Sequence, residues 1–348
     1  VFEDGGDVGD EYNYSYPLRD RIVFSVGLPA VIELVEQGPL RITYKVSQTL
    51  PVPQCATPDR QGRSEDLVNL SITSYISLSV GAKRVEIMTE VDNTAQDHRL
   101  RVLFPSGIQT DYSYAEGHYD VVKRPIKLPD PNAYPIEKPC PTHPQRAFVD
   151  VNDGDNGLAI INQGLPEYEV KDDDCRTIAL TLLRGVDAIS HSDLLTRPGG
   201  NAGWPYSTPG GQCLGKHTFQ YAIAPHQGTW QDALMYREAH QHNVPCRVVQ
   251  TDSHSGELPE TLSFVSVSPA SFIISAIKKA EAEDALIVRV YNASDQAQSG
   301  EIRVCQKIKR AVLTNLNEEP LETIAPNSEF TVTFQTRPWE VKTVQFNF

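Results

Sequence analysis

The sequence lacks the features that mark membrane proteins and nucleic-acid-binding proteins. It has no run of about 18 apolar residues, the minimum for a membrane-spanning helix. It also lacks a basic excess, since 31 Lys and Arg residues against 45 Asp and Glu residues give a net charge of −14. Binding to phosphate backbones needs a concentrated basic surface. We therefore expect no membrane and no nucleic acid among its partners. An acidic chain suits a neutral substrate such as a sugar, and it is also ordinary for bacterial cytosolic proteins.

Several catalytic and metal-binding motifs are missing as well. There is no serine-hydrolase, P-loop or dinucleotide-binding motif. The nine histidines include no H-E-x-x-H pair, and His240 and His242 would diverge on a helix, so a zinc site is not indicated. Six cysteines occur without a C-x-x-C pair or the spacing of a small disulfide framework. We expect separate thiols in a reducing compartment, which favours a cytoplasmic protein, and no metal bound by these residues.

What the sequence has in abundance is the alternation of apolar and polar residues. A period of two is typical of antiparallel strands with one face in a core and one in water. Turn residues such as Gly81 and Ala82 separate successive segments, which predicts an antiparallel meander. Only Gln231 to His240 has the composition of a helix, and Pro245 ends it. The strands predicted in this part are 41–46, 67–80, 84–88, 98–104, 147–151, 157–162, 177–184 and 217–224.

Two stretches rich in proline or glycine interrupt this pattern. Residues 123–144 contain seven prolines, and residues 197–211 contain five glycines and three prolines. Proline cannot donate to a sheet ladder, so we predict two long loops on a β scaffold, where functional residues often lie. After His254 the pattern changes to short, evenly spaced strands, typical of a small sandwich. The predicted domains are therefore 1–255 and 256–348, with strands in the second at 263–267, 272–279, 285–291, 301–308, 330–335 and 340–346.

The segment from Glu3 to Glu11 packs five carboxylates among three glycines. Glycines let the backbone turn sharply, and the carboxylates could line a solvated loop or bind a cation or sugar hydroxyls. Tyr12, Tyr14 and Tyr16 follow at strand spacing, which would put them on one face, either in a core or as a sugar platform. Two further polar stretches, 152–157 and 172–174, are predicted as a tight hairpin turn and a solvated turn.

Several characteristic phrases occur in a fixed order, among them GDVGDEYNYSYP, IALTLLRGV, SHSDLLTRPGG and TPGGQCLGKHTFQYAIAPH. Their order and wording resemble the C-terminal region of family 38 glycoside hydrolases, the α-mannosidases. The resemblance extends over nearly the whole chain and is strongest to the bacterial branch of α-mannosidases and mannosylglycerate hydrolases. It implies an all-β fold, in which a large antiparallel galactose-mutarotase-like sandwich is followed by a small immunoglobulin-like β-sandwich.

The resemblance also implies a role in a zinc-dependent retaining α-mannosidase. In that family an aspartate nucleophile and the His and Asp zinc ligands lie in an N-terminal catalytic domain, for which this sequence has no counterpart. Because the chain begins at Val1 inside a strand-and-turn motif, we expect it to be cut from a longer protein and to be inactive alone. Two residues, Tyr12 and Arg184, map onto substrate-contacting positions of the family, although an ion pair is an equal alternative for Arg184. Gln212 and His217 lie in the most distinctive phrase and receive no role.

Two other functions stay open. A free-standing carbohydrate-binding sandwich would need an aromatic platform, which Tyr12, Tyr14 and Tyr16 could supply. An aldose mutarotase would need a Glu base and a His acid, and no segment resembles that signature. Unpaired sheet edges invite association. A homo-oligomer is therefore expected as a further partner, beside the α-mannoside substrate and the N-terminal catalytic domain.

Overall fold

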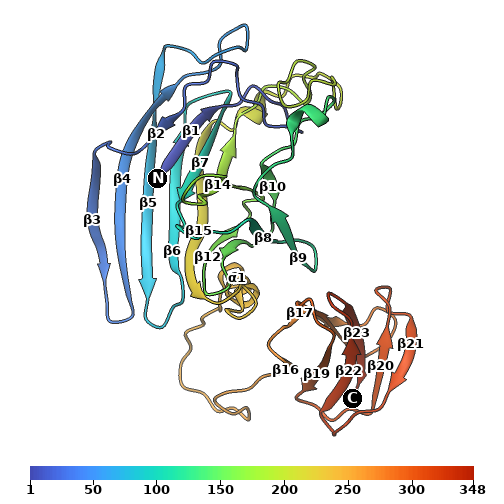
Figure 1. Ribbon diagram of the computed structural model, residues 1–348. Helices are drawn as coiled ribbons and strands as arrows, with labels where there is room; N and C mark the ends of the chain where they lie inside the picture. Colours follow the sequence, from blue (N-terminus) through green and yellow to red (C-terminus); the bar gives the residue numbers. More distant parts are fainter. The chain divides into compact units, whose positions relative to one another are not determined.

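The computed structural model describes residues 1–348, and almost all of its regular structure is antiparallel β (Figure 1). The chain divides into two compact units, each with its own core. The larger comprises Val1–Ala115 and Lys123–Ala233, and the smaller comprises Glu116–Val122 and Leu234–Phe348. The predicted all-β fold, a large sandwich followed by a small one, is confirmed. None of the helices has the length and hydropathy that crossing a bilayer requires.

The larger unit holds a nine-stranded sheet built on the predicted meander. Its order is β3-β4-β5-β6-β15-β12-β11-β8-β9. The first four strands follow the chain, whereas β15 arrives from far along the sequence and pairs with both β6 and β12. The strands are β3 (Ala30–Gln37), β4 (Arg41–Pro53), β5 (Leu67–Ser79), β6 (Val85–Asn93), β8 (Tyr112–Glu116), β9 (Val121–Pro125), β11 (Phe148–Asn152), β12 (Asn156–Gln163) and β15 (Gly215–Gln227).

A six-stranded sheet in the order β10-β13-β14-β7-β1-β2 forms the other layer. β1 lies between β7 and β2, with Phe2 opposite Val102 and Glu3 opposite Phe24. Glu3 and Asp4 are therefore built into a sheet, whereas Asp7, Asp10 and Glu11 follow β1 in a turn. The strands are β1 (Phe2–Gly6), β2 (Val23–Phe24), β7 (His98–Phe104), β10 (Thr142–Pro144), β13 (Glu167–Val170) and β14 (Ile178–Arg184).

The two sheets share one apolar core. Each buried aliphatic side chain contributes about 1.5–3 kcal/mol, so the alternation in the sequence also selects the strand register. The hydroxyl of Tyr221, buried in the same core, lies 2.8 Å from Thr89 Oγ1 and is thus satisfied. The core is built from residues of both sheets, among them Leu100, Val102, Leu180 and Leu182 on one side and Leu50, Leu70, Ile72 and Ile160 on the other.

The smaller unit is a sandwich of a three-stranded sheet, β16-β19-β22, and a five-stranded sheet, β17-β18-β23-β20-β21. Phe272, Val288 and Phe334 belong to its core. The predicted strand 301–308 is displaced to 298–304, and the strands 310–314 and 320–324 were not predicted, although only the second of them is exposed. The strands are β16 (Val265–Ser268), β17 (Phe272–Lys279), β18 (Leu286–Asn292), β19 (Gln298–Val304), β20 (Arg310–Thr314), β21 (Pro320–Ile324), β22 (Thr331–Thr336) and β23 (Val341–Asn347).

The remaining segments are short helices and loops. Helix α1 (Met235–Asn243) begins four residues later than predicted, because Asp232 accepts hydrogen bonds from the amide and hydroxyl of Thr229 and holds that segment as a turn. The predicted loops at 123–144 and 197–211 contain only short elements, including η1 (Pro131–Ala133) and η2 (Pro209–Gln212). The predicted domain division at 255/256 falls within 244–264, which holds no helix or strand. The turns at 152–157 and 172–174 are confirmed.

Candidate functional site

The acidic segment at the N-terminus is not a solvated loop. Four of its five carboxylates are buried, those of Glu3, Asp4, Asp7 and Asp10. A buried carboxylate is costly unless a cation or several hydrogen-bond donors face it. Each of these four meets an arginine from a segment at least 59 residues away. Because these arginines lie so far away along the chain, the composition of the segment alone could not predict that its carboxylates are buried.

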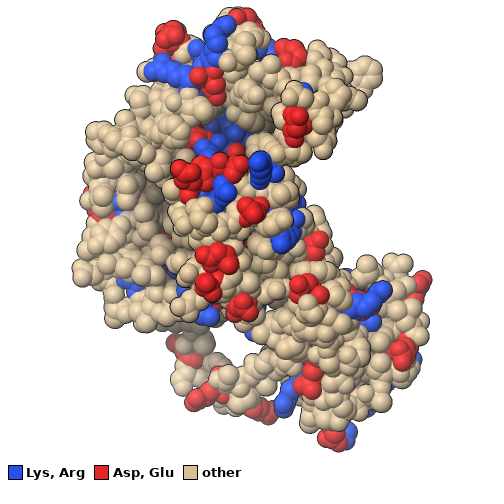
Figure 2. All heavy atoms as spheres, in the orientation of Figure 1, with Lys and Arg blue, Asp and Glu red and all other residues tan.

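The two faces of β1 carry separate ion-pair groups. On one face Asp4 contacts the Arg63 guanidinium, and its second oxygen lies 2.6 Å from His98 Nδ1. On the other face Glu3 pairs with Arg101 and Lys171. Figure 2 shows acidic and basic side chains gathered over the part of the larger unit where Figure 1 labels β7 and β14. Removing one member of such a group would leave a buried charge without a partner and lower the free energy of unfolding by about 3–5 kcal/mol.

The prediction that Tyr12, Tyr14 and Tyr16 share one face of a strand is wrong. Residues 12–16 are not a strand. The guanidinium carbon of Arg99 lies 3.5 Å from the centre of the Tyr14 ring, and burial raises the pKa of Tyr14 to about 12. Tyr12 and Tyr16 instead expose 58% and 48% of their surface. The three rings therefore cannot act together as a sugar platform.

Arg184 closes the turn that follows β1. Its Nε donates to Asp7 Oδ2 at 2.7 Å, and its Nη2 donates to the carbonyl oxygen of Asp10 at 3.1 Å. Burial disfavours the charged guanidinium, but the charge and hydrogen bond of Asp7 outweigh it, so the pKa of Arg184 is raised. Arg184 thus forms an ion pair with Asp7, which was one of the two alternatives that the sequence left open for it. The structure gives no protein partner to its remaining nitrogen, Nη1.

Asp10 ties the same turn to the loop at 190–200. Its Oδ1 accepts from the amides of Tyr12 and Asn13 at 3.0 and 2.8 Å, and its Oδ2 accepts from the His191 amide at 2.9 Å and from Arg197. Burial alone would raise the pKa of Asp10, but these donors outweigh it and lower the pKa. Through Asp10 the structure brings Tyr12 and Arg184, the two predicted site residues, onto one turn.

The side chain of Tyr12 leans on a glycine of the 197–211 loop. A Cβ atom added to Gly203 would lie 2.9 Å from the Tyr12 hydroxyl. The site therefore combines the exposed ring of Tyr12 with the guanidinium of Arg184, which contacts Asp7 and Asp10. These groups can donate to neutral oxygen atoms such as sugar hydroxyls, whereas the neighbouring buried carboxylates are occupied by arginine.

Gln212 ends η2 and His217 lies in β15, and both make hydrogen bonds within the larger unit. The Gln212 side chain makes two hydrogen bonds to Asp97, at 2.8 Å to its amide and 2.7 Å to its carboxylate. His217 Nε2 lies 2.7 Å from the carbonyl oxygen of Cys213. Both residues thus pin the turn between η2 and β15. In the segment TPGGQCLGKHTF, these two side chains thus have structural contacts that fix the loop.

The residues that the structure describes do not offer a zinc site. No group of three or more His, Cys, Asp and Glu side chains is arranged to hold a metal ion. The buried carboxylates that could supply oxygen ligands are already neutralised by arginine, for example Asp10 by Arg197. A catalytic zinc site needs three protein ligands and an open position. The chain's own residues therefore do not fit the zinc that the resemblance implies.

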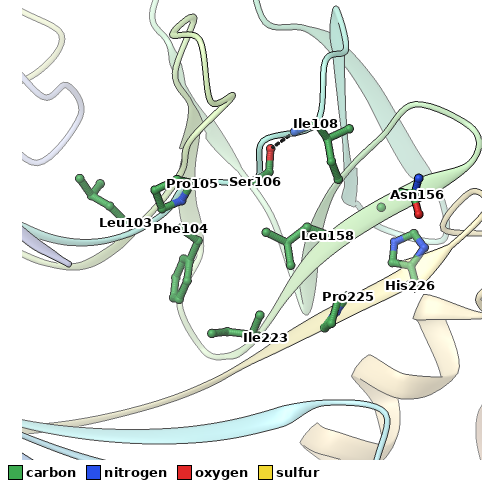
Figure 3. Close-up of a pocket in the computed structure, with 11 residues that line it drawn as sticks. Leu103, Phe104, Pro105, Ser106, Ile108, Asn156, Leu158, Ile223, Pro225 and His226 are labelled. Atoms are coloured by element: carbon green, nitrogen blue, oxygen red, sulfur yellow. Dashed lines mark hydrogen bonds between the residues drawn. The ribbon is translucent and has the colours of Figure 1, made fainter.

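A separate hollow of about 510 Å³ opens between the two sheets (Figure 3). Its lining is mainly apolar, with Phe104 from one sheet and Leu158 and Ile223 from the other. At its edge, His226 Nε2 lies 2.6 Å from Asp150 Oδ2. Burial lowers the pKa of His226, but the hydrogen bond and charge of Asp150 outweigh it, so the pKa is raised. Because its histidine is already paired, this hollow offers little chemistry and is an opening of the core.

Comparison with known proteins gives the family. The model for the glycosyl hydrolases family 38 C-terminal domain matches residues 1–188. This chain belongs to glycosyl hydrolase family 38. The family's C-terminal beta sandwich domain matches residues 271–344 in the smaller unit. The first match includes both Tyr12 and Arg184, and the resemblance drawn from the sequence is confirmed.

Individual family 38 relatives agree. A protein of Halalkalibacterium halodurans named "Putative mannosylglycerate hydrolase" is 29% identical over 99% of this chain and 38% of its own length. Alpha-mannosidase 2C1 of Mus musculus is 25% identical over 72% of this chain and 22% of its own. The crystal structure of an alpha-mannosidase from Enterococcus faecalis gives a TM-score of 0.84 at 30% identity, covering 99% of this chain and 38% of that one. The chain thus spans less than half the length of these relatives.

Proposed function

We propose that this chain is the β-sandwich portion of a retaining, zinc-dependent α-mannosidase. In this proposal a catalytic domain outside these 348 residues supplies the nucleophile and the metal, and the chain packs on that domain and completes the substrate pocket. The observation that carries it is the turn 7–12, where Tyr12 and Arg184 share the buried anchor Asp10. Membership of family 38 supports the same reaction class.

The roles of the two residues follow from their chemistry. Arg184 is fixed at one edge by Asp7 and keeps Nη1 for a sugar oxygen, which a permanently charged, planar group binds well. Tyr12 offers an apolar ring and a hydroxyl that can donate or accept. Neither residue transfers a proton in this proposal. Both bind and orient the mannose, while acid–base chemistry and the nucleophilic aspartate belong to the catalytic domain.

The same proposal covers location and assembly. The six cysteines are all free, which supports a cytoplasmic protein. The edge strand β3 exposes Val31 and Ile32, which supports association of two copies along this edge.

The alternative function, a free-standing carbohydrate-binding module, would require mannoside binding by the 348-residue chain itself. Calorimetric titration of the isolated chain with mannose and mannobiose distinguishes the two, because only the module would bind better than millimolar.

The cleanest test of the proposal removes one hydroxyl. In the protein that contains this chain and its catalytic domain, Tyr12→Phe should lower kcat/KM for an α-mannoside about two- to tenfold, the usual worth of one hydrogen bond. Arg184→Lys should lower it about tenfold or more, because lysine keeps the charge facing Asp7 but loses the planar fork. Tyr16→Phe removes the hydroxyl of an equally accessible ring and is the control.

Thermal unfolding of each variant separates a catalytic effect from a folding effect. Tyr12 is exposed, so its variant should keep the wild-type melting temperature. If Tyr12→Phe and Tyr16→Phe have the same kinetics as the wild type, the Tyr12 hydroxyl makes no hydrogen bond to the substrate. If the wild-type protein cleaves no α-mannoside, the proposed activity itself is wrong.

A further inference from the structure

The three most exposed aromatic side chains of the larger unit lie at the candidate site. Trp204 and Tyr206 expose 74% and 63% of their surface, and Tyr12 exposes 58%. The rings of Trp204 and Tyr206 lie with their centres 6.4 Å apart and their planes at 25°. Large apolar surfaces left in water in this way commonly mark a binding surface. A platform of Tyr12, Tyr14 and Tyr16 was one alternative from the sequence, and of these three Tyr12 is the most exposed.

The backbone holds this pair of rings in place. The amide of Tyr206 donates to the carbonyl oxygen of Trp204 at 2.9 Å, which closes a three-residue turn around Pro205, whose ring restricts φ. The carbonyl of Tyr206 then accepts from the Ile189 amide at 2.9 Å, and the Thr208 amide donates to Asp187 at 2.7 Å. The backbone of Tyr206 and Thr208 is therefore hydrogen-bonded to residues 187–189, which follow shortly after Arg184 in the sequence.

The other end of the loop is fixed to the same anchor as Tyr12. Arg197 pairs with Asp10 and donates to the carbonyl of Gly200 at 2.9 Å. The Ala202 amide donates to Ser190 Oγ at 3.0 Å, which also accepts from Arg197. Gly203, next to Trp204, lies against the Tyr12 ring. Loop 197–211 is thus tied to the turn of Tyr12 and Arg184 on both sides of the exposed pair.

We infer that Trp204 and Tyr206 form a stacking platform for a second pyranose ring of the substrate, beside the mannose held by Tyr12 and Arg184. The inference rests on the proposed function and names its substrate class. The C–H bonds on one face of a pyranose carry partial positive charge and pack well on the negative face of an aromatic ring. The preferred substrate is then an α-mannosyl disaccharide or a longer glycan, whereas mannosylglycerate has no second ring to stack.

Two substrates with different leaving groups test the platform. α-Mannobiose supplies a second ring and α-mannosyl fluoride does not. In the protein with its catalytic domain, Trp204→Ala should lower kcat/KM for mannobiose about five- to tenfold and leave the fluoride unchanged. Trp204→Phe keeps a ring and should retain most of the wild-type rate. Tyr44→Ala removes an exposed ring on β4 and is the matched control, with both rates unchanged.

Each outcome is decisive. Selective loss on mannobiose, recovered in Trp204→Phe, supports the platform. Unchanged rates on all linkage isomers of mannobiose overturn it and leave the proposed activity intact. Equal losses on both substrates also overturn it, and would indicate that Trp204 packs on the catalytic domain, which limited proteolysis of the variant would reveal. Inactivity of the wild type on both substrates would instead mean that the proposed function has failed.

Discussion

At the scale of single residues, the larger unit contains buried charged side chains. Their burial is tolerated because each of them contacts a group of opposite charge. Burial would raise the pKa of Glu3, but Arg101 and Lys171 outweigh it and lower the pKa. The same holds for Asp10. A carboxylate whose pKa is lowered in the folded state stabilises the fold above its unfolded pKa of about 4, and this contribution is lost as the pH falls further. We therefore expect these groups to make the larger unit less stable as the pH falls below about 4.

His226 makes a pH-dependent contribution of the opposite sign, nearer neutrality. Its pKa is raised in the folded state, so its ion pair with Asp150 stabilises the fold fully below about pH 6.5 and less as the pH rises through the raised value. His226→Gln should therefore destabilise the protein more at about pH 6 than at about pH 9. Urea unfolding of wild type and variant at these pH values measures the difference.

A second histidine is the control for this prediction. Burial, followed by the charge of Arg124, lowers the pKa of His143. The contribution of His143 is therefore present above about pH 6.5 and is lost as the pH falls, so the cost of His143→Gln should change with pH in the opposite direction. Parallel pH dependences for the two variants would contradict the assignment of His226.

At the scale of elements, the turn 7–12 is a short connection whose shape depends on one glycine. Gly9 follows β1 and precedes the anchor Asp10. A Cβ atom there would overlap the carbonyl oxygen of Asn13 and lie 2.7 Å from Asp7 Oδ1. Backbone atoms cannot move aside as a flexible side chain can. The turn that presents Tyr12 thus requires the absence of a side chain at this position.

Gly9→Ala should therefore lower the free energy of unfolding by about 1–3 kcal/mol, the usual cost of overpacking. It should also displace Tyr12, and under the proposed function it should then lower kcat/KM for an α-mannoside in the protein that contains the catalytic domain. Gly38→Ala is the matched control, because a Cβ there would be 3.7 Å from its nearest neighbour, the carbonyl oxygen of Arg41. Equal unfolding free energies for both variants would show that the turn tolerates a side chain at position 9.

At the scale of the whole molecule, two cores lie in two units. The smaller unit packs Phe272 against Phe334, with ring centres 5.7 Å apart, in a core that includes no residue of the larger unit. A unit with its own core can unfold as its own cooperative transition. Substitutions in one core should therefore report on that unit alone.

Phe334→Ala should destabilise the smaller unit by about 3–5 kcal/mol, the usual cost of emptying a buried phenylalanine site. Calorimetry should show one shifted transition, with the transition of the larger unit unchanged. Phe264→Ala removes an exposed ring of the same unit and should shift neither transition. A single transition that moves as a whole in Phe334→Ala would show that the two units unfold together.

The sequence by itself determined the all-β class, the meander from β4 to β6, and the family, because alternation and characteristic phrases are local properties that can be read along the chain. It also singled out Tyr12 and Arg184 by resemblance. It could not foresee that Glu3 to Asp10 are buried, because that depends on Arg63, Arg101, Arg184 and Arg197 arriving from distant segments. Only the tertiary structure decided which carboxylates are neutralised, that Tyr14 is covered by Arg99, and that Trp204 and Tyr206 stand exposed beside Tyr12. Burial and charge pairing are properties of neighbours in space, and sequence spacing does not record them.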